Sequence, residues 1–369
     1  MTKETTKRAV RRKPRSVRAG VAAMLTVYSV CHLCVDMCCC AAMLAFTRDT
    51  EHFALSLLIY NFCAFALQLP IGAIADRFSR SGAFAVFGCA VVALSMLATP
   101  APVVLAALLG IGNACFHVGG GVFALRSDRR STSLGIFVSP GAIGLFAGRY
   151  AVDTGLVSEF ALMVSVAVIM ILCVLAILLT EPVSDTYESV APFPKGLSVS
   201  YPMRNFMACV CFFIVVCMRS FGGMTFNFGW RADTDAAVAA CALAVAAALG
   251  KASGGIMADK LGMRAASSVT LIVSAALMIF SQSFIPAVFA VLAFNMTMPL
   301  TLRATADVCR GHEGASFGLL TLALFIGYLP TVYGATLPFG TYGNVMIAVL
   351  SMAIMASGLE LMSRRTKNA

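Results

Sequence analysis

Charge is scarce in this chain. Lys, Arg, Asp and Glu make up 12% of its 369 residues, whereas roughly 25% is usual in soluble domains. Hydrophobic residues make up 60%, so too little polar sequence is left to cover a water-soluble core. The apolar residues form twelve runs of about 20 residues, the length of helix that crosses a bilayer. These runs are 19–46, 51–75, 82–99, 101–126, 132–153, 157–179, 204–227, 234–258, 264–283, 285–307, 314–337 and 342–363.

Polar sequence forms a separate internal segment at one place, residues 181–203. This segment carries Glu181, Asp185 and Glu188 among several prolines, a composition typical of a linker. It separates residues 1–180, which include a basic N-terminal tail, from residues 204–369. We therefore predict an all-α membrane protein with twelve transmembrane helices in two pseudo-symmetric six-helix bundles. No room remains for a soluble catalytic or nucleotide-binding domain, so we expect neither an enzyme nor a cofactor.

The net charge of +10 is spread over the N-terminal tail and alternate loops. This alternation places both termini and the basic loops in the cytoplasm by the positive-inside rule. It therefore indicates a multi-pass protein of the inner (cytoplasmic) membrane, with the lipid bilayer rather than nucleic acid as its partner. The first apolar run is too long for a signal peptide and is read as an uncleaved span. In the loops on the other side, the basic residues are only Arg48 and Arg231.

Cysteine is frequent, with fourteen residues, and five of them gather in the first run. Within a membrane span, Cys behaves as a small apolar residue, although clustered thiolates also suit Cu(I) or Zn(II). At 100° per residue the thiols at positions 31, 34 and 38 share one stripe, and His32 and Asp36 lie on roughly the opposite side. We therefore favour packing over metal transport and expect no metal site. The five cysteines are Cys31, Cys34, Cys38, Cys39 and Cys40.

One short motif occurs twice. GAIADRFSR at 72–80 recurs as GIMADKLGMR at 255–264, so Asp259 follows Asp76 by 183 residues (259 minus 76). Two related halves with a charged loop in the same place are typical of a secondary transporter. The motif resembles the loop signature G-x-x-x-D-[RK]-x-G-[RK] of the major facilitator superfamily, with Ser79 in place of the second glycine and Arg264 one position late. The resemblance implies transport of a small molecule by alternating access, and we expect a monomer.

The repeated motif also suggests a gate at the cytoplasmic ends of the spans. We expect Asp76 and Asp259 to stabilise the outward-facing state, with Asp76 capping the N-terminus of a neighbouring helix. Two ion pairs are predicted at the mouths of the fourth and tenth spans, Arg77 with Asp128 and Lys260 with Asp307.

Five ionisable residues lie deep in the apolar runs, namely His32, Asp36, His117, Arg219 and Arg303. A charge at the bilayer centre costs at least about 2.5–3.5 kcal/mol, so such a residue usually faces a cavity or a partner. His32 and Asp36 are one helical turn apart and share a face. The offset of 183 relates Asp36 to Arg219 and places the equivalent of His117 one turn from Arg303. The superfamily resemblance implies that these four spans line one central cavity.

These residues suit proton-coupled movement of a small organic anion. Arg binds a carboxylate or phosphonate bidentately, so we predict substrate binding by Arg219, Arg303 and His117. Histidine titrates near neutral pH, so we predict proton coupling by Asp36, His32 and His117. An alternative role for Asp36 and Arg219 is a structural ion pair between the two halves.

Two further segments bear on how the helices pack and on the direction of transport. Gly119, Gly120 and Gly121 follow His117 and predict close helix packing or a flexible break. The sequence GIFVSPGAIG at 135–144 is similar to an antiporter signature of the superfamily and slightly favours export. The His32-x-x-x-Asp36 pair and the string GNACFH at 112–117 resemble the fosmidomycin-resistance branch, although Val118 and Gly119 stand where that branch has Pro and an acidic residue.

The sequence thus predicts a proton-coupled secondary transporter for a small organic anion, with export slightly favoured. Two alternatives stay open. The first is an exporter of neutral or cationic drugs or metabolites, in which the arginines are structural. The second is a non-transporting membrane sensor or assembly protein.

Overall fold

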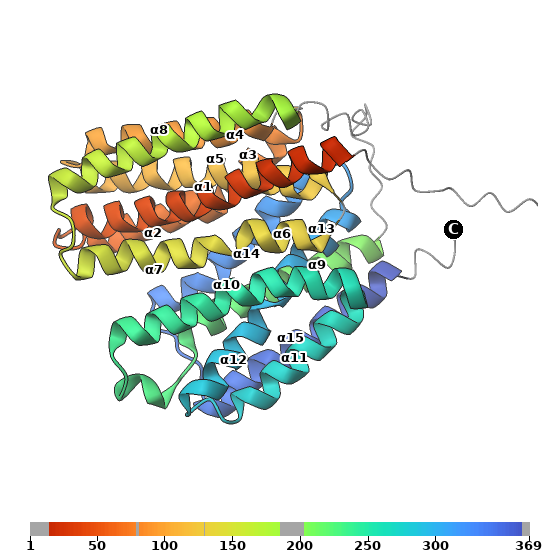
Figure 1. Ribbon diagram of the computed structural model, residues 1–369. Helices are drawn as coiled ribbons and strands as arrows, with labels where there is room; N and C mark the ends of the chain where they lie inside the picture. Colours follow the sequence, from red (N-terminus) through yellow and green to blue (C-terminus); the bar gives the residue numbers. More distant parts are fainter. Residues whose placement is uncertain (1–14, 79–80, 129, 185–202, 364–369) are drawn as a thin grey trace, which may run out of the picture.

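The computed structural model describes residues 15–78, 81–128, 130–184 and 203–363, and every regular element in these ranges is helical (Figure 1). Most of the linker, Arg80, and the basic residues before 15 and after 363 lie outside the described residues. The elements before the linker are α1 (Arg15–Thr47), α2 (Phe53–Asn61), η1 (Phe62–Ala66), α3 (Gln68–Ala75), α4 (Ser81–Ser95), η2 (Met96–Ala98), α5 (Pro102–Ser127), α6 (Ser131–Val138), α7 (Pro140–Asp153) and α8 (Glu159–Ser184). The elements after it are α9 (Met203–Thr225), η3 (Gly229–Ala232), α10 (Ala236–Leu261), α11 (Met263–Met278), α12 (Phe284–Asn295), α13 (Thr297–Val308), α14 (Glu313–Val332) and α15 (Thr341–Ser363).

The twelve predicted runs all appear as helices or pairs of consecutive helices. Eleven are long and apolar enough to cross a membrane, and the twelfth, Met263–Met278, is shorter. Its 16 residues span about 24 Å at 1.5 Å per residue, somewhat less than the roughly 30 Å of a bilayer core. The helical ends agree with the predicted runs to within a few residues, because hydropathy itself sets the length of each span.

Three of the spans are interrupted near their middle. One contains the π-helical turn Phe62–Ala66, and another changes helix between Asn295 and Thr297. In the third, α6 ends at Val138 and α7 begins at Pro140, because proline has no N–H to continue the ladder. The break places Gly141 at the start of a new helix.

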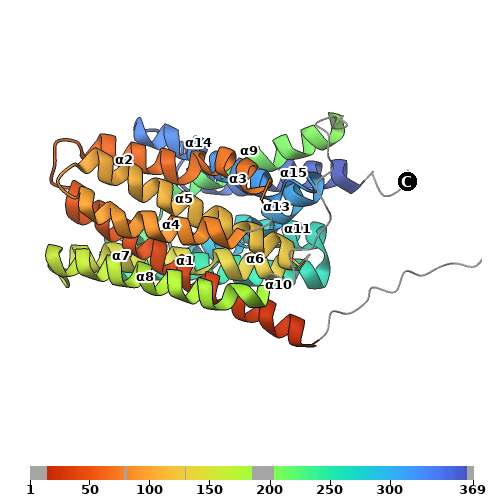
Figure 2. The same cartoon turned by 90° about the horizontal axis from the view of Figure 1, so that it is seen from above.

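The helices run side by side, and α1 begins at the end of the molecule where α15 finishes (Figures 1 and 2). We call this end the terminal side. The regions before and after the linker meet mainly where α3 packs on α14 and where α6 and α7 pack on α10. Glycine permits this approach, because a Cβ at Gly72 would clash with the Gly314 carbonyl group and one at Gly255 with the Ser131 carbonyl group.

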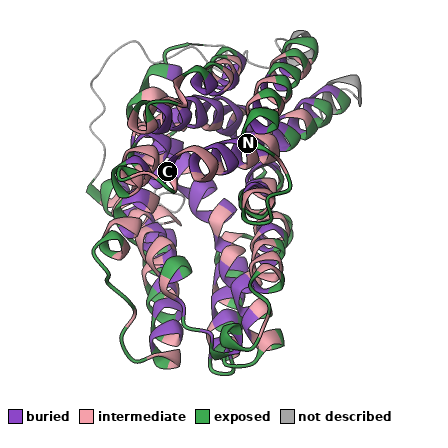
Figure 3. Cartoon of the chain, turned by 90° about the vertical axis from the view of Figure 1, so that its left-hand side faces the viewer, coloured by how far each residue is buried: buried purple, intermediate pink, exposed green. Residues whose placement is uncertain are grey.

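Figure 3 shows buried residues between the helices and exposed ones on their outer faces. The exposed residues include many large apolar side chains. Leu97, Phe160 and Leu179 are 81%, 77% and 80% exposed, as expected for side chains that contact lipid rather than water. Inside, a Cβ at Gly119 would lie 2.6 Å from the Ala85 nitrogen. The close-packing interpretation of the triple glycine is therefore confirmed, and α5 lies against α4 along its length.

Candidate functional site

His32, Asp36 and His117 come together in the middle of the helix bundle, and we call them the triad. His32 Nε2 lies 3.2 Å from Asp36 Oδ2 and 2.8 Å from His117 Nε2. His117 Nε2 is 3.6 Å from Asp36 Oδ1. The predicted shared face of His32 and Asp36 is confirmed, and the tertiary structure adds His117 from α5.

Backbone and amide groups hold the triad in place. His32 Nδ1 is 2.6 Å from the Phe137 carbonyl oxygen, and His117 Nδ1 is 2.9 Å from that of Asn113. A carbonyl oxygen only accepts, so each Nδ1 carries a proton. The hydrogen bond between the two Nε2 atoms then requires one further proton, which one Nε2 donates to the lone pair of the other. Asn113 also donates from Nδ2 to Asp36 Oδ1 at 2.9 Å. Three groups, from Asn113 on α5 and Phe137 on α6, therefore hold the two imidazoles and the carboxylate in place.

Gly141 leaves the space in which the triad sits. A Cβ at this position would clash with Asp36 Oδ2 and with His32 Nε2. The break at Pro140 and the absence of a side chain at Gly141 together bring the backbone of α7 up to the triad. Sequence analysis treated this glycine as part of a transport signature and did not connect it with His32 and Asp36.

Two cations, the buried Arg219 and the half-buried Lys251, belong to helices that follow the linker. Arg219 on α9 donates from Nη1 to Thr301 Oγ1 at 3.5 Å. Lys251 on α10 interacts electrostatically with both Asp36 and Arg219. The alternative ion pair between Asp36 and Arg219 does not form among the residues that the structure describes. In its place, Asp36 faces the triad histidines and Lys251.

Sequence reasoning missed Lys251, although two signals were available. It is a charged residue in the middle of the run 234–258, where insertion is costly. It also follows Gln68 by 183 positions, and Gln68 is a buried polar residue at the corresponding place in α3. Asn113 was quoted within a motif but was given no role.

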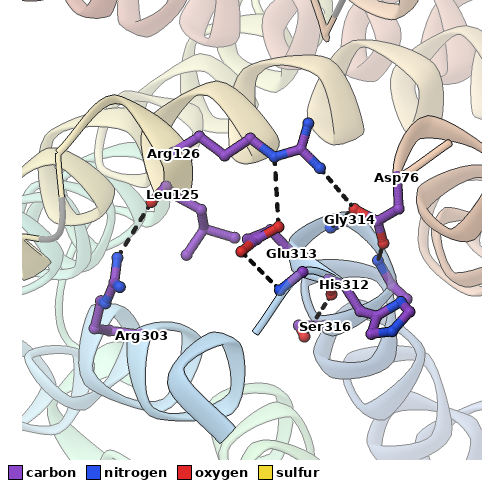
Figure 4. Close-up of polar contacts among 10 residues, drawn as sticks. Asp76, Leu125, Arg126, Arg303, His312, Glu313, Gly314 and Ser316 are labelled. Atoms are coloured by element: carbon purple, nitrogen blue, oxygen red, sulfur yellow. Dashed lines mark hydrogen bonds and ion pairs between the residues drawn. The ribbon is translucent and has the colours of Figure 1, made fainter. Parts of the chain in front are cut away.

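Arg303 lies near the terminal end of α13, away from the middle of that span. Its Nη1 donates to the Leu125 carbonyl at 3.2 Å (Figure 4). Its Nη2 donates to Asp307 Oδ1 at 2.7 Å. Arg303 thereby ties α13 to the end of α5. The structure therefore places Arg219 beside Thr301 and holds Arg303 at the terminal side, and the substrate-binding roles of both arginines stay predictions.

Asp76 caps a helix that begins after the linker. Its Oδ1 accepts from the Gly314 N–H and its Oδ2 from the Ala315 N–H, both at 2.8 Å. Arg126 donates to Asp76 Oδ1 at 3.1 Å and to Glu313 Oε2 at 3.4 Å (Figure 4). The predicted capping by Asp76 is confirmed. Burial raises the pKa of Asp76 despite the opposing effect of the two N–H groups and Arg126.

Asp259 makes the reciprocal contact. Its Oδ1 accepts from the Ser131 N–H at 2.9 Å, and its Oδ2 accepts from the Thr132 N–H at 2.9 Å and from the Thr132 hydroxyl at 2.5 Å. Ser131 and Thr132 precede Gly314 and Ala315 by 183 positions, the same offset that separates the two aspartates. The two caps are therefore equivalent under the internal repeat.

The two predicted ion pairs at the span mouths are wrong. Asp307 pairs with Arg303, and Asp128 accepts from the Arg130 N–H and the Ser133 hydroxyl, acting as a local cap for the start of α6. Arg77 and Lys260 are exposed and form no ion pair with any residue that the structure describes. The carboxylates of Asp128 and Asp307 bind closer groups, which lie on the same helix or at the start of the next one.

Cys31 and Cys34 on α1 face α8. Cys31 Sγ contacts the Cys173 carbonyl oxygen at 4.0 Å, and the Cys34 thiol is hydrogen-bonded to Cys173. The predicted separation of this stripe from His32 and Asp36 is confirmed, whereas Cys39 lies against α5 and contacts the Leu109 carbonyl oxygen at 3.8 Å. Among the described residues, the group of possible metal ligands with donor atoms all within 4.8 Å of one another is the triad, which contains no cysteine.

A bundle of apolar helices around buried charges, closed at one end by reciprocal caps, is the architecture of a membrane transport protein. The chain belongs to the Major Facilitator Superfamily, whose family model matches residues 41–331. The protein is therefore a transporter and not an enzyme. No curated protein sequence matches the chain.

Solved structures agree with this fold. A variant of the E. coli fucose:proton symporter FucP superposes with a TM-score of 0.64 at 12% identity, over 95% of this chain and 100% of that chain. A bacterial homologue of the iron transporter ferroportin, in an outward-facing state, superposes with a TM-score of 0.60 at 12% identity, over 96% and 100%. At such identities the likeness concerns the fold alone.

Proposed function

We propose that this protein is a secondary active transporter that works by alternating access between two six-helix bundles, residues 1–180 and 204–369. The observation that carries the proposal is the reciprocal capping of α14 by Asp76 and of α6 by Asp259. Each carboxylate belongs to one half of the chain and each capped helix to the other. Opening of the terminal side requires both caps to break, whereas opening of the opposite side leaves them intact.

The strength of the caps suits a reversible gate. A carboxylate at a helix N-terminus contributes about 0.3–1 kcal/mol when exposed and up to about 2 kcal/mol when partly buried. Two caps together are therefore on the order of 1–4 kcal/mol, and about 1.4 kcal/mol changes an equilibrium tenfold. Such a closed state dominates but still opens during each cycle. We place the terminal side in the cytoplasm, as the positive-inside rule predicts, and the protein in the cytoplasmic membrane.

The charges around the triad favour a small anion as substrate. Lys251 interacts electrostatically with the single carboxylate of Asp36 and with Arg219, so this network holds two positive charges and one negative charge. Arg219 lies on α9 and Lys251 on α10, so both belong to the second half, while the triad belongs to the first. We propose that the anionic group binds between the two halves at Arg219 and Lys251. Proton coupling, the export direction and the monomeric state stay predictions of the sequence.

Reconstitution tests the proposed function. Purified protein in liposomes should exchange a radiolabelled small carboxylate or phosphonate from a panel, and Arg219→Gln should raise the half-saturating concentration at least about tenfold. Arg231→Gln provides the control, because Arg231 lies in the loop segment between α9 and α10. Transport of neutral or cationic compounds that is insensitive to Arg219→Gln would support the alternative exporter. If folded wild-type protein in liposomes transports no compound of the panel, the proposal is contradicted.

A further inference from the structure

We propose that His32, Asp36 and His117 form a binding site for a divalent transition-metal ion of the zinc class. This proposal goes beyond anion transport and does not depend on it, because metal binding is measured without transport. The triad lies among the described residues with its donor atoms within 4.8 Å of one another. His32 is 5% exposed and Asp36 is 8% exposed.

The tautomers of the two histidines direct both lone pairs to one point. The carbonyl oxygens of Phe137 and Asn113 bind the two Nδ1–H groups, so when both imidazoles are neutral, as a metal ion requires, both Nε2 atoms are available as ligands. These Nε2 atoms face each other at 2.8 Å beside a carboxylate. Two lone pairs and an anion that converge in this way are stabilised by a shared cation. Histidine ligands of metals characteristically donate their other N–H to a carbonyl or carboxylate.

The spacing of the ligand atoms fits one ion at their centre. Two ligands about 2.0–2.1 Å from a tetrahedral zinc ion lie about 3.3–3.4 Å from each other. The three edges of the triad are 2.8, 3.2 and 3.6 Å, and these values bracket that separation. A single proton shared by the two Nε2 atoms leaves His117 Nε2 3.6 Å from Asp36 Oδ1, which is too long for a hydrogen bond. A metal ion at the centre binds all three ligand atoms.

The surroundings support the ligands in two ways. Asn113 donates to Asp36 Oδ1 at 2.9 Å and so orients the carboxylate. Gly141 has no side chain where a Cβ would clash with both Asp36 Oδ2 and His32 Nε2. Glycine therefore lets the α7 backbone pack against the ligand atoms without displacing them. A hydrogen-bonded carboxylate is a feature of metal sites.

The ligand set selects the class of metal. Two imidazoles and one carboxylate suit Zn²⁺, Fe²⁺, Co²⁺ or Ni²⁺, whereas Ca²⁺ and Mg²⁺ prefer all-oxygen sites and Cu(I) prefers thiolates or thioethers. Three protein ligands leave a further position for water or for a substrate anion. The site thus resembles an exchangeable site more than a closed structural one.

Lys251 is the group that competes with the metal ion. It interacts electrostatically with Asp36 and Arg219 and comes from the second half of the chain, while all three ligands come from the first. An ammonium ion near Asp36 weakens the attraction of the carboxylate for a dication. We therefore expect Lys251→Met to bind the metal ion more tightly than the wild-type protein does.

Metal binding is testable on the full-length protein in detergent after removal of metals. Titration with Zn²⁺ in a calorimeter and with Co²⁺ in a visible spectrometer should give one site per chain. Loss of second-shell partners costs 10–100-fold in metal affinity, so Asn113→Ala should lie in that range and Asp36→Asn or His117→Gln should lose about 100-fold or more. The double variant His52→Gln/His312→Gln replaces the other two histidines of the chain and should bind like the wild type.

Two further measurements test the metal site independently of the ligand variants. Alkylation of the thiols with N-ethylmaleimide should leave the Co²⁺ spectrum unchanged, because no cysteine belongs to the triad. In the wild-type protein, Zn²⁺ should protect His32 and His117, but not His52 or His312, from diethylpyrocarbonate, and this holds even if a ligand variant fails to fold. Binding that disappears on alkylation, absence of a one-to-one site, or binding unaffected by all three ligand variants would overturn the metal site. None of these results bears on anion transport.

Discussion

Asp76 and Asp259 are related by the internal repeat, and each caps a helix in the opposite half of the chain. Asp76 accepts from the N–H groups of Gly314 and Ala315, and Asp259 from those of Ser131 and Thr132. The contacts join the two halves at the terminal side on both flanks of the molecule, where α3 meets α14 and α6 meets α10. Because the caps are reciprocal, loss of one weakens one flank and leaves the other in place.

Replacement of the Asp76 carboxylate is expected to loosen the α14 cap. Asp76→Asn keeps the shape but removes the charge and one acceptor, so the amides of Gly314 and Ala315 lose protection. Hydrogen–deuterium exchange of peptides covering 313–316 should accelerate by about tenfold, in line with a loss of about 1–2 kcal/mol. Substrate affinity should change by no more than a few-fold.

The matched control for this variant is Asp235→Asn. Asp235 caps α10 within its own half, accepting from the N–H groups of Ala237 and Val238 at 3.0 Å. In the Asp235→Asn variant, hydrogen–deuterium exchange of residues 313–316 should proceed at the wild-type rate. Unchanged exchange in Asp76→Asn, or a large affinity loss with normal turnover, would mean that Asp76 is not a gate residue.

A wedge at Gly255 should open the terminal side. Its Cβ would clash with the Ser131 carbonyl and lie 2.9 Å from Thr132 Cα, and overpacking of this kind costs about 1–3 kcal/mol. Since the clash exists only while α6 and α10 are in contact, Gly255→Val should shift the equilibrium toward the open state. Deuterium exchange at residues 131–134 reports the shift. Gly223→Val is the control, because nothing lies within 4 Å of a Cβ there.

A methyl group at Gly141 should disrupt the triad. The added carbon in Gly141→Ala meets Asp36 Oδ2 and His32 Nε2, so the ligand atoms have to move apart. We expect a thermal unfolding temperature several degrees lower, in keeping with about 1–3 kcal/mol, together with reduced Zn²⁺ affinity. Gly223→Ala should be neutral or slightly stabilising, because alanine favours a helix by about 1 kcal/mol over glycine. Equal behaviour of the two variants would show that the space at Gly141 is not required.

Arg219 and Arg303 should give different kinetic defects. Arg219 interacts electrostatically with Lys251, so Arg219→Gln should mainly weaken substrate binding. Arg303 is bound to Leu125 and Asp307 at the terminal side, so Arg303→Gln should mainly change the turnover rate. Substrate dependence of uptake into liposomes separates the two parameters. A loss of affinity in Arg303→Gln with unchanged turnover would restore the substrate-binding role that the sequence suggested for it.

The sequence by itself determined the spans, the repeat and the shared face of His32 and Asp36. These features depend on local properties, namely the length of an apolar run and the 3.6-residue period of a helix. The repeat at 76 and 259 even predicted that Asp76 caps a helix, although it did not identify which one. Local pattern could not select partners, because many polar groups lie at comparable places along twelve helices.

Only the tertiary structure decided which groups meet. It joined His117 to the pair on α1, brought Lys251 near Asp36 in place of a direct contact with Arg219, and held Arg303 at the terminal side. It also showed that Asp128 and Asp307 bind nearer partners than Arg77 and Lys260. The physical reason is that the rotation and depth of each helix follow from glycine contacts and from the break at Pro140. A shift of a single residue along a helix turns a side chain by about 100°, which is enough to replace one partner with another.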